Sequence, residues 1–172
     1  MVNKTAVVVC GRFNPPTKGH YYLISSAEKY AAENGYDFWL LPTRSEGNAK
    51  NPIPHKLKIE ILKELFPMVN IVDDSYVKHL YDLVEMLRCY GYNHFIGIGD
   101  EERRNYYEGV EDLEYISLGD RTNQQEGLLA ISATKVRESA IQGNVEKYLS
   151  MMPEQMSLKR LDECYNIIRK RI

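Results

Sequence analysis

The sequence predicts an α/β protein built on an open, five-stranded and mostly parallel sheet, flanked by helices and followed by a helical C-terminal tail. Short apolar runs bounded by glycine, proline or polar residues alternate about five times with segments of helical spacing. The first run, residues 4–10, is apolar without alternation, as expected for a strand that is covered on both faces. Right-handed crossovers would then place the successive strands in one sheet.

The first half of the chain contains the clearest helix. Leu23, Ala27, Tyr30 and Ala31 recur at helical spacing, and the following Asn-Gly pair is a typical helix stop. The predicted elements are a strand at 4–10, a helix at 18–34, a strand at 36–42, a long polar loop at 43–54 and a helix at 55–66.

The second half continues the alternation with shorter strands. Ile131 is expected to open a late helix, and the tail is expected to be helical from residue 144 with a break near Pro153. The predicted elements before the late helix are a strand at 68–72, a helix at 76–90, a strand at 93–98, a strand at 113–117 and a loop at 118–130.

Length and composition predict a single domain over residues 1–172, with residues 144–172 as a helical C-terminal extension. The chain has 172 residues, of which 44% are hydrophobic and 27% charged, and no low-complexity tract or linker divides it. Its net charge of −2 gives no general attraction to nucleic acid or to a membrane surface, so neither is expected as a partner.

The ends and the cysteines predict a cytoplasmic location. The first five residues are too polar for a signal peptide, and no apolar run reaches membrane-spanning length. Cys10, Cys89 and Cys164 lie far apart, are odd in number and include no C-x-x-C pair. This spacing argues against a zinc site or a disulfide framework and fits a reducing compartment.

Three segments rich in glycine or polar residues, 11–19, 43–54 and 99–104, each follow a predicted strand. Because the carboxyl ends of parallel strands meet at one edge of a sheet, we expect these segments to gather there. In open α/β sheets, ligands bind at this edge, where the strand order reverses.

Residues 11–20, Gly-Arg-Phe-Asn-Pro-Pro-Thr-Lys-Gly-His, join the first strand to the first helix, an arrangement that suits phosphate binding. Neither of the common glycine-rich phosphate motifs is present. Pro15 and Pro16 remove two amide donors, which leaves the amides of residues 12–14 and of the helix start. The alternative is that this loop is only a turn.

Three residues of this loop could serve a phosphate. Thr17 supplies a hydroxyl, and Gly19 permits close approach of backbone or ligand. His20, on the first helical turn, can donate a hydrogen bond to a phosphate oxygen that gains charge during a reaction. Taken alone, His20 is better explained as a partly exposed residue at a helix start.

A second polar segment, Ile131-Ser-Ala-Thr-Lys-Val-Arg137, precedes the late helix. Ser132 and Thr134 lie where side-chain oxygens can cap a helix or bind a phosphate. Arg137, one turn further on, can place a guanidinium on the same ligand. The alternative is a helix cap followed by a solvated arginine.

Together the two segments resemble the nucleotidylyltransferase superfamily, whose motifs are G-x-F-[ND]-P-x-[HT]-x-G-H and I-S-[ST]-T-x-[IV]-R. Residues 11–20 resemble the first motif, and residues 131–137 the second, from which only Ala133 departs. The two lie in the expected order and separation, and the resemblance covers nearly the whole chain. It implies a five-stranded, parallel, Rossmann-like domain and an enzyme that releases pyrophosphate from a nucleoside triphosphate.

The resemblance also implies roles for matching residues. Thr17 would orient the α-phosphate, His20 would stabilise charge on it, and Arg137 with Ser132 and Thr134 would hold the β- and γ-phosphates. Mg²⁺ would neutralise the triphosphate and be held mainly by it, because no acidic cluster suggests a protein-built metal site. The residues expected to bind nucleotide are Gly11, Arg12, Phe13, Asn14, Gly19, Asp100, Ile131, Ser132 and Thr134.

Several cations remain as further candidates. Lys50, in the polar loop, resembles mobile-loop cations that reach the reacting phosphates, against the alternative of a solvated charge. Lys18 is expected to be exposed. Candidates for binding a substrate phosphate are, in order of preference, Arg12, Arg44, Arg103 and Arg104.

The motif details favour ATP as nucleotide and a small phosphorylated acceptor, nicotinamide mononucleotide, which would give NAD. Phosphopantetheine and FMN adenylyltransferases remain alternatives, and so do cytidylyltransferases. The eight-residue separation of Arg121-Thr122 from Ile131 weakens the cytidylyl alternative. A nucleotide-binding regulator without turnover is the non-enzymatic alternative. Homo-oligomers are common among similar proteins, so one is a possible assembly here.

Overall fold

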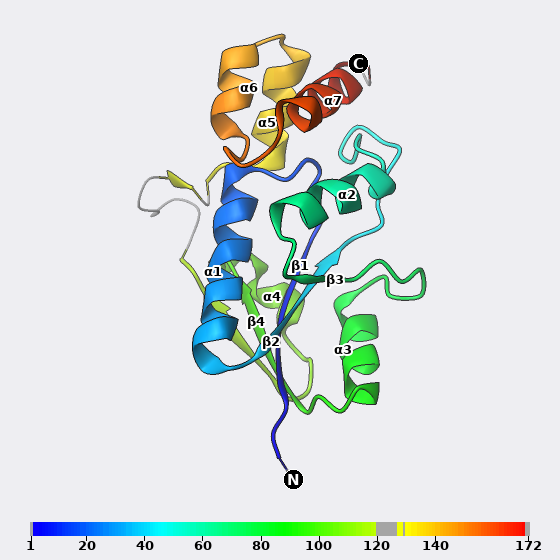
Figure 1. The fold of residues 1–172 in the computed structure, drawn as a ribbon, viewed down its shortest axis with the longest axis vertical. Helices are drawn as coiled ribbons and strands as arrows, with labels where there is room; N and C mark the ends of the chain where they lie inside the picture. Colours follow the sequence, from blue (N-terminus) through cyan, green and yellow to red (C-terminus); the bar gives the residue numbers. More distant parts are fainter. Residues whose placement is uncertain (1, 120–126, 129, 171–172) are drawn as a thin grey trace.

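The five apolar runs form one sheet in the computed structural model, which describes residues 2–119, 127, 128 and 130–170. The strand order is β3-β2-β1-β4-β5, and every pair of neighbours is parallel (Figure 1). The strands are β1 (Thr5–Gly11), β2 (Asp37–Pro42), β3 (Asn70–Ile71), β4 (His94–Gly99) and β5 (Leu113–Ser117). The strand order reverses between β1 and β4, so the predicted fold class is confirmed and its switch point is located.

Helices follow most of the strands, and three more form the tail at the top of Figure 1. The predicted helical tail is confirmed by the last two of them. The helices are α1 (Lys18–Asn34), α2 (His55–Leu65), α3 (Leu80–Cys89), the 3-10 turn η1 (Glu101–Arg103), α4 (Arg104–Tyr107), α5 (Ala133–Ile141), α6 (Val145–Met151) and α7 (Leu158–Arg169).

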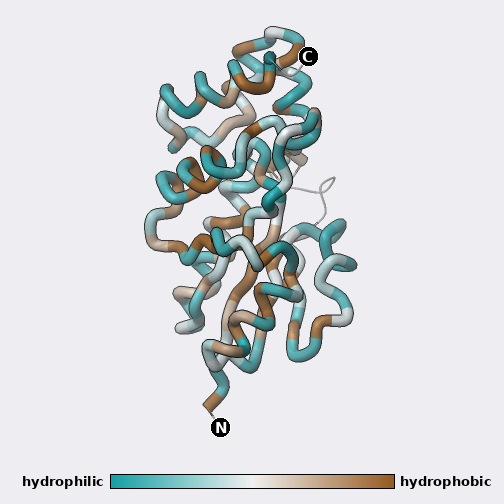
Figure 2. Tube along the Cα trace, turned by 90° about the vertical axis from the view of Figure 1, so that its right-hand side faces the viewer, coloured by the Kyte–Doolittle hydropathy of each residue, from teal (hydrophilic) through white to brown (hydrophobic). Residues whose placement is uncertain are grey.

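Alternate residues of β1 serve two separate cores, one on each face of the sheet. Val7 and Val9 pack in the same cluster as Ile24 of α1, whereas Val8 packs in the cluster of Leu83 of α3. The tube in Figure 2 shows the hydrophobic colouring concentrated along these strands. This burial on both faces explains why β1 lacks polar alternation.

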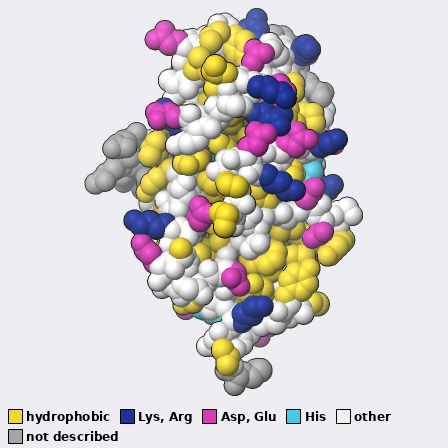
Figure 3. Space-filling view, in the orientation of Figure 1, with side chains coloured by type: hydrophobic (Ala, Val, Ile, Leu, Met, Phe, Trp, Pro, Cys, Tyr) yellow, Lys and Arg dark blue, Asp and Glu magenta, His cyan; other side chains and the backbone are white. Residues whose placement is uncertain are grey.

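The tail helices form a third core with α2 and the loop before it. Ile53 and Ile61 are fully buried in the same cluster as Val136, Tyr148 and Cys164. Ion pairs add to this contact, because Arg160 of α7 lies within 4 Å of carboxylates of Glu60, Glu64 and Glu163. Figure 3 shows acidic and basic side chains intermixed over this junction. The tail is therefore packed against the part of the sheet edge that follows β2.

Some boundaries differ from the sequence prediction for identifiable reasons. The helix predicted at 76–90 begins at Leu80, because the Asp82 carboxylate accepts hydrogen bonds from the amides of Lys78 and His79 and so fixes the helix start. The strand predicted at 68–72 shrinks to two residues at the sheet edge, where it pairs with β2 only. The late helix begins at Ala133 rather than Ile131, because Ser132 is its N-cap.

The helical turns at 101–107 were not predicted. Asp100 caps the turn by accepting a hydrogen bond from the amide of Arg103, and Arg104 pairs with Glu101. Tyr107 then anchors the segment beneath the sheet edge, because its hydroxyl accepts a hydrogen bond from the amide of Cys10. The middle of the predicted loop at 118–130 lies outside the described residues. Among those that are described, no helix has the length and apolar character needed to cross a membrane.

Candidate functional site

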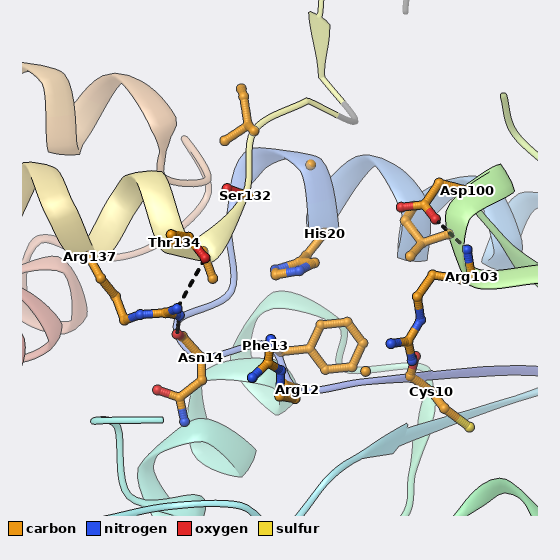
Figure 4. Close-up of a pocket in the computed structure, with 15 residues that line it drawn as sticks. Cys10, Arg12, Phe13, Asn14, His20, Asp100, Arg103, Ser132, Thr134 and Arg137 are labelled. Atoms are coloured by element: carbon orange, nitrogen blue, oxygen red, sulfur yellow. Dashed lines mark hydrogen bonds between the residues drawn. The ribbon is translucent and has the colours of Figure 1, made fainter. Parts of the chain in front are cut away.

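A pocket opens at the switch point, between the carboxyl ends of β1 and β4 and the first turns of α1 and α5 (Figure 4). It gathers the first motif, the second motif and the segment after β4 around one space. Its lining residues are Cys10, Gly11, Arg12, Phe13, Asn14, Gly19, His20, Leu23, Asp100, Arg103, Ile131, Ser132, Ala133, Thr134 and Arg137.

His20 is held in a defined orientation by the start of its own helix. Its Nδ1 accepts the amide hydrogen of Thr17 at 3.1 Å, and its own amide donates to the Thr17 hydroxyl at 3.2 Å. The ring also packs edge-on against Phe13, with centroids 5.0 Å apart. Because Nδ1 accepts, the ring proton of neutral His20 resides on Nε2, so the imidazole is a donor in both its neutral and its charged form.

The loop around Phe13 is under local backbone strain. Phe13 has a φ of 47°, a left-handed conformation that is costly for a bulky residue. Its ring is buried and lies so close to Gly11 that a Cβ there would approach the ring to 2.7 Å. The absence of a side chain at Gly11 leaves room for the Phe13 ring, and this ring packs against the imidazole of His20.

The two motifs are in direct contact at the start of α1. The hydroxyl of Thr17, which is fully buried, donates to the carbonyl of Ile131 at 3.3 Å. A Cβ on Gly19 would lie 2.6 Å from the carbonyl of Leu128 and 2.8 Å from that of Ile131. The close approach that Gly19 permits is therefore backbone against backbone, and Thr17 joins the motifs instead of lining the pocket.

Asn14 connects the first motif to the loop after β2. Its side-chain amide donates to the carbonyl of Ile53 at 2.9 Å, and its oxygen accepts the Ile53 amide hydrogen at 2.8 Å. Asn14 is 1% exposed, so both bonds are shielded from water. This pair of bonds fixes the position of the β2–α2 loop relative to the pocket.

Arg137 reaches across from α5 to the first motif, as Figure 4 shows. Its guanidinium donates to the carbonyl of Asn14 at 2.8 Å and to the hydroxyl of Thr134 at 3.2 Å. Burial, and after it the nearby charge of Arg12, lowers the pKa of Arg137. The predicted alternative of a solvated arginine is wrong, because Arg137 is only 8% exposed.

The starts of α1 and α5 both border the pocket. Ser132 caps α5 by accepting a hydrogen bond from the amide of Lys135, as Thr17 caps α1. The unpaired amides and the positive ends of two helix dipoles favour an anion in such a place. The arrangement suits a ligand with several phosphates.

The segment after β4 forms the opposite wall. Arg103 donates to the carbonyl of Cys10 at 3.3 Å and stacks on the Tyr106 ring, while the carbonyl of Asp100 accepts from the hydroxyl of Tyr115. Burial raises the pKa of the Cys10 thiol to about 12, so this cysteine is not a nucleophile.

The structure separates the predicted cations into two groups. Arg12 and Arg103 line the pocket, whereas Arg44 is paired with Asp73 and Arg104 with Glu101. Lys50 is exposed and does not line the pocket. Lys18 does not line it either, and its ammonium lies 3.7 Å from a carboxylate oxygen of Glu154.

Eleven of the thirteen predicted site residues thus line one pocket, and Thr17 and Lys50 do not. The sequence reasoning missed Cys10, Leu23 and Ala133, which line the pocket, and Lys58, which lies fully buried beneath the adjoining loop. A signal for Lys58 was present, since it is a charge on the helix face formed by Leu57, Ile61 and Leu62.

Within the part of the chain that the structure describes, no three acidic, His or Cys side chains are grouped to hold a metal.

Comparison with known proteins gives one family and several similar folds. A family model described as cytidylyltransferase-like matches residues 8–139. A nicotinate-nucleotide adenylyltransferase from Vibrio parahaemolyticus, itself named as putative, is 16% identical with a TM-score of 0.63, over 97% of this chain and 96% of that one. Nicotinic acid mononucleotide adenylyltransferase of Plasmodium falciparum, solved with NaAD, is 14% identical with a TM-score of 0.64, over 98% and 96%. No curated protein sequence matches, and identities this low establish the fold alone.

Proposed function

Because the chain belongs to the cytidylyltransferase-like family and is a nucleotidyltransferase, we propose that it transfers AMP from ATP to the phosphate of a pyridine mononucleotide. The acceptor expected from the sequence is nicotinamide mononucleotide, and the two solved structures reported above are named for its nicotinate counterpart. The observation that carries the proposal is the pocket itself, where His20 and Arg137 meet the starts of α1 and α5.

The proposed reaction is a displacement at the α-phosphorus. A phosphate oxygen of the acceptor forms the new P–O bond, and the bond between the α-phosphorus and the bridging oxygen breaks. Pyrophosphate leaves with the electron pair of that bond. Such a reaction needs positioning and charge stabilisation more than covalent catalysis.

The side chains of the pocket fit this division of work. His20 would donate a hydrogen bond to an α-phosphate oxygen or to the bridging oxygen as their charge grows. Arg137 and the amides at the start of α5 would hold the β- and γ-phosphates, with Ser132 and Thr134 beside them. The hydroxyl of Thr17 is already hydrogen-bonded to the carbonyl of Ile131 and the amide of His20. Thr17 would therefore act by fixing the positions of these two residues relative to each other.

Mg²⁺ fits this site as an ion carried by the triphosphate. Asp100 is the one acidic residue among those lining the pocket, and its side chain already accepts a hydrogen bond from the amide of Arg103. When bound, the ion would neutralise part of the triphosphate charge. The protein residues would supply the remaining positive charge.

Pyrophosphate release tests the proposal. The purified protein with Mg²⁺ would be offered ATP or CTP, each with nicotinamide mononucleotide, nicotinate mononucleotide, phosphopantetheine, FMN or glycerol 3-phosphate. We expect pyrophosphate and a dinucleotide from ATP with a pyridine mononucleotide. Product with CTP or another acceptor would assign a different transferase, and ATP binding without any product would indicate a regulator.

A further inference from the structure

Lys58, on the second turn of α2, is a charged residue in an interior position. Its side chain is completely buried, and its ammonium donates to the carbonyl of Thr43 at 2.5 Å. An ammonium has three N–H donors, and this is its one hydrogen bond to any residue that the structure describes. A lysine so placed is costly to the fold, because one hydrogen bond does not replace its lost hydration.

The surroundings of Lys58 are also short of hydrogen-bond partners. The hydroxyl of Thr43, the side-chain oxygen of Asn51 and Nδ1 of His55 are buried without a partner among the described residues. All three lie in the segment from Thr43, whose carbonyl accepts from Lys58, to His55 at the start of α2. Most buried polar groups in folded proteins are paired, so such a concentration needs an explanation.

Two cations and one carboxylate act on Lys58. Burial, together with the charges of Arg12 and Arg44, lowers the pKa of Lys58 to about 8 against the opposing effect of Glu46. Hydrogen bonds tie both buried cations to the backbone around Arg12, because Thr43, whose carbonyl accepts from Lys58, donates its amide to the carbonyl of Gly11 at 2.9 Å. Arg137 donates to the carbonyl of Asn14, on the other side of Arg12. Figure 4 shows Arg12 below His20, between Arg137 and Arg103. Its guanidinium makes no hydrogen bond or ion pair with the described part of the chain.

From this geometry we propose that Arg12 and Lys58 form an anion subsite for the phosphate monoester of the acceptor. Arg12, which is exposed and lines the pocket, would contact the phosphate, and Lys58 would act as a positioning residue behind it through its charge. The inference rests on the proposed function, because it assigns the second phosphate of that reaction. Two mutually repelling cations are stabilised when a dianion lies beside them.

The location separates this subsite from that of the triphosphate. The triphosphate would lie at the starts of α1 and α5, whereas Lys58 belongs to α2 and contacts the end of β2. Arg12 stands between the two, since the residue before it is bonded to Thr43, the partner of Lys58, and Asn14 after it is bonded to Arg137. An acceptor phosphate on Arg12 would therefore face the α-phosphate, as a displacement requires.

The test is binding of nicotinamide mononucleotide and of its riboside, which lacks the phosphate, measured by calorimetry with a non-hydrolysable ATP analogue present. Lys58→Met should weaken mononucleotide binding about tenfold or more and leave riboside and ATP-analogue binding unchanged. Arg12→Met, at an exposed position, should give the same selective loss. Lys58→Arg should restore affinity, and Lys56→Met, an exposed charge on the same helix, should have no effect.

Three outcomes would overturn the subsite: unchanged mononucleotide binding in both Met variants, an equal loss for the riboside, or a loss of ATP-analogue binding alone, which would assign these cations to the triphosphate. Inorganic phosphate serves as a probe that requires no turnover. Phosphate binding that depends on Lys58 supports the subsite even if no acceptor yields pyrophosphate. Turnover with an unchanged acceptor KM in Lys58→Met would remove the subsite and leave the proposed function intact.

Discussion

Two loops border the same sheet edge and are built in opposite ways. In the β1–α1 loop, Asn14 and Thr17 are buried, and their side-chain polar groups are hydrogen-bonded to backbone. In the β2–α2 loop and the helix start after it, Thr43, Asn51 and His55 each leave a buried polar atom without a described partner. The buried polar groups of the first loop are satisfied within the protein, whereas those of the second are not. On the proposed function, the first loop is a preformed part of the nucleotide site, and the second lies next to the proposed acceptor subsite.

The largest expected effect is on turnover. His20→Ala should lower kcat about 10²–10³-fold, because on the proposed function it removes the donor to a phosphate oxygen whose charge grows during the reaction. Stability should fall by only about 1 kcal/mol, the usual value of a helix cap. Steady-state pyrophosphate release and thermal unfolding measure the two effects. His94→Ala, at the amino end of β4, is the control, and near-normal turnover in His20→Ala would remove His20 from the mechanism.

The next effect is on stability. Asn14→Ala leaves the amide and carbonyl of Ile53 unpaired in a buried place, which should cost about 2–4 kcal/mol in the free energy of unfolding. Denaturant titration measures it. Asn34→Ala, which removes an exposed bond to the carbonyl of Tyr30, should cost far less. An equal loss of unfolding free energy in the two variants would show that the buried bonds of Asn14 do not stabilise the β1–α1 loop more than an exposed bond would.

Lys58 makes a pH-dependent contribution of similar size. Its pKa of about 8 in the folded protein lies below the value of 10.5 for a free lysine, so the unfolded chain binds more protons between these pH values. The wild type should therefore gain stability relative to Lys58→Met as pH rises through this window, by about 3 kcal/mol in total. Denaturant titrations of both proteins from pH 7 to 10.5 measure the difference. A difference in unfolding free energy that stays constant with pH would show that burial and the charges of Arg12 and Arg44 do not lower the pKa of Lys58.

A smaller effect is expected where the motifs touch. Gly19→Ala would place a Cβ against the carbonyls of Leu128 and Ile131, so the start of α1 must shift, at a cost of about 1–3 kcal/mol. ATP-analogue affinity, measured by calorimetry, should fall as well. Gly35→Ala at the other end of α1, where φ is 68°, should lower stability but leave that affinity unchanged. Loss of affinity in both variants would argue for a general effect of unfolding.

The sequence predicted the β1–α1 loop and its helix far better than the β2–α2 loop. Helix α1 was predicted with its observed bounds, because its cap, its stop and its periodicity agree. The pocket residues followed from two motifs that lie on the carboxyl edge of the sheet. Roles that depend on side-chain bonds could not be predicted: nothing local shows that the Thr17 hydroxyl is taken by Ile131 or that Arg137 is bound to Asn14.

Lys58 shows why the rest was missed. Residues 55–66 were correctly expected to be a helix, and a lysine in such a helix is ordinarily assigned to solvent. Its burial results from contacts with the end of β2, fifteen residues away. The short helix at 101–107 was missed for a related reason, since Tyr107 is fixed by a bond to Cys10 far away in the sequence.

Ile53 connects the β2–α2 loop to two distant parts of the chain at once. Its backbone is bonded to Asn14 beside the pocket, while its side chain is buried in the core of α5–α7. Its amide hydrogen is thus shielded from solvent, although residues 44–50 just before it are exposed. In a hydrogen-exchange measurement by NMR, this amide hydrogen would exchange slowly with solvent, whereas the amide hydrogens of residues 44–50 would exchange fast. That single resonance would report both on occupancy of the pocket and on the integrity of the tail.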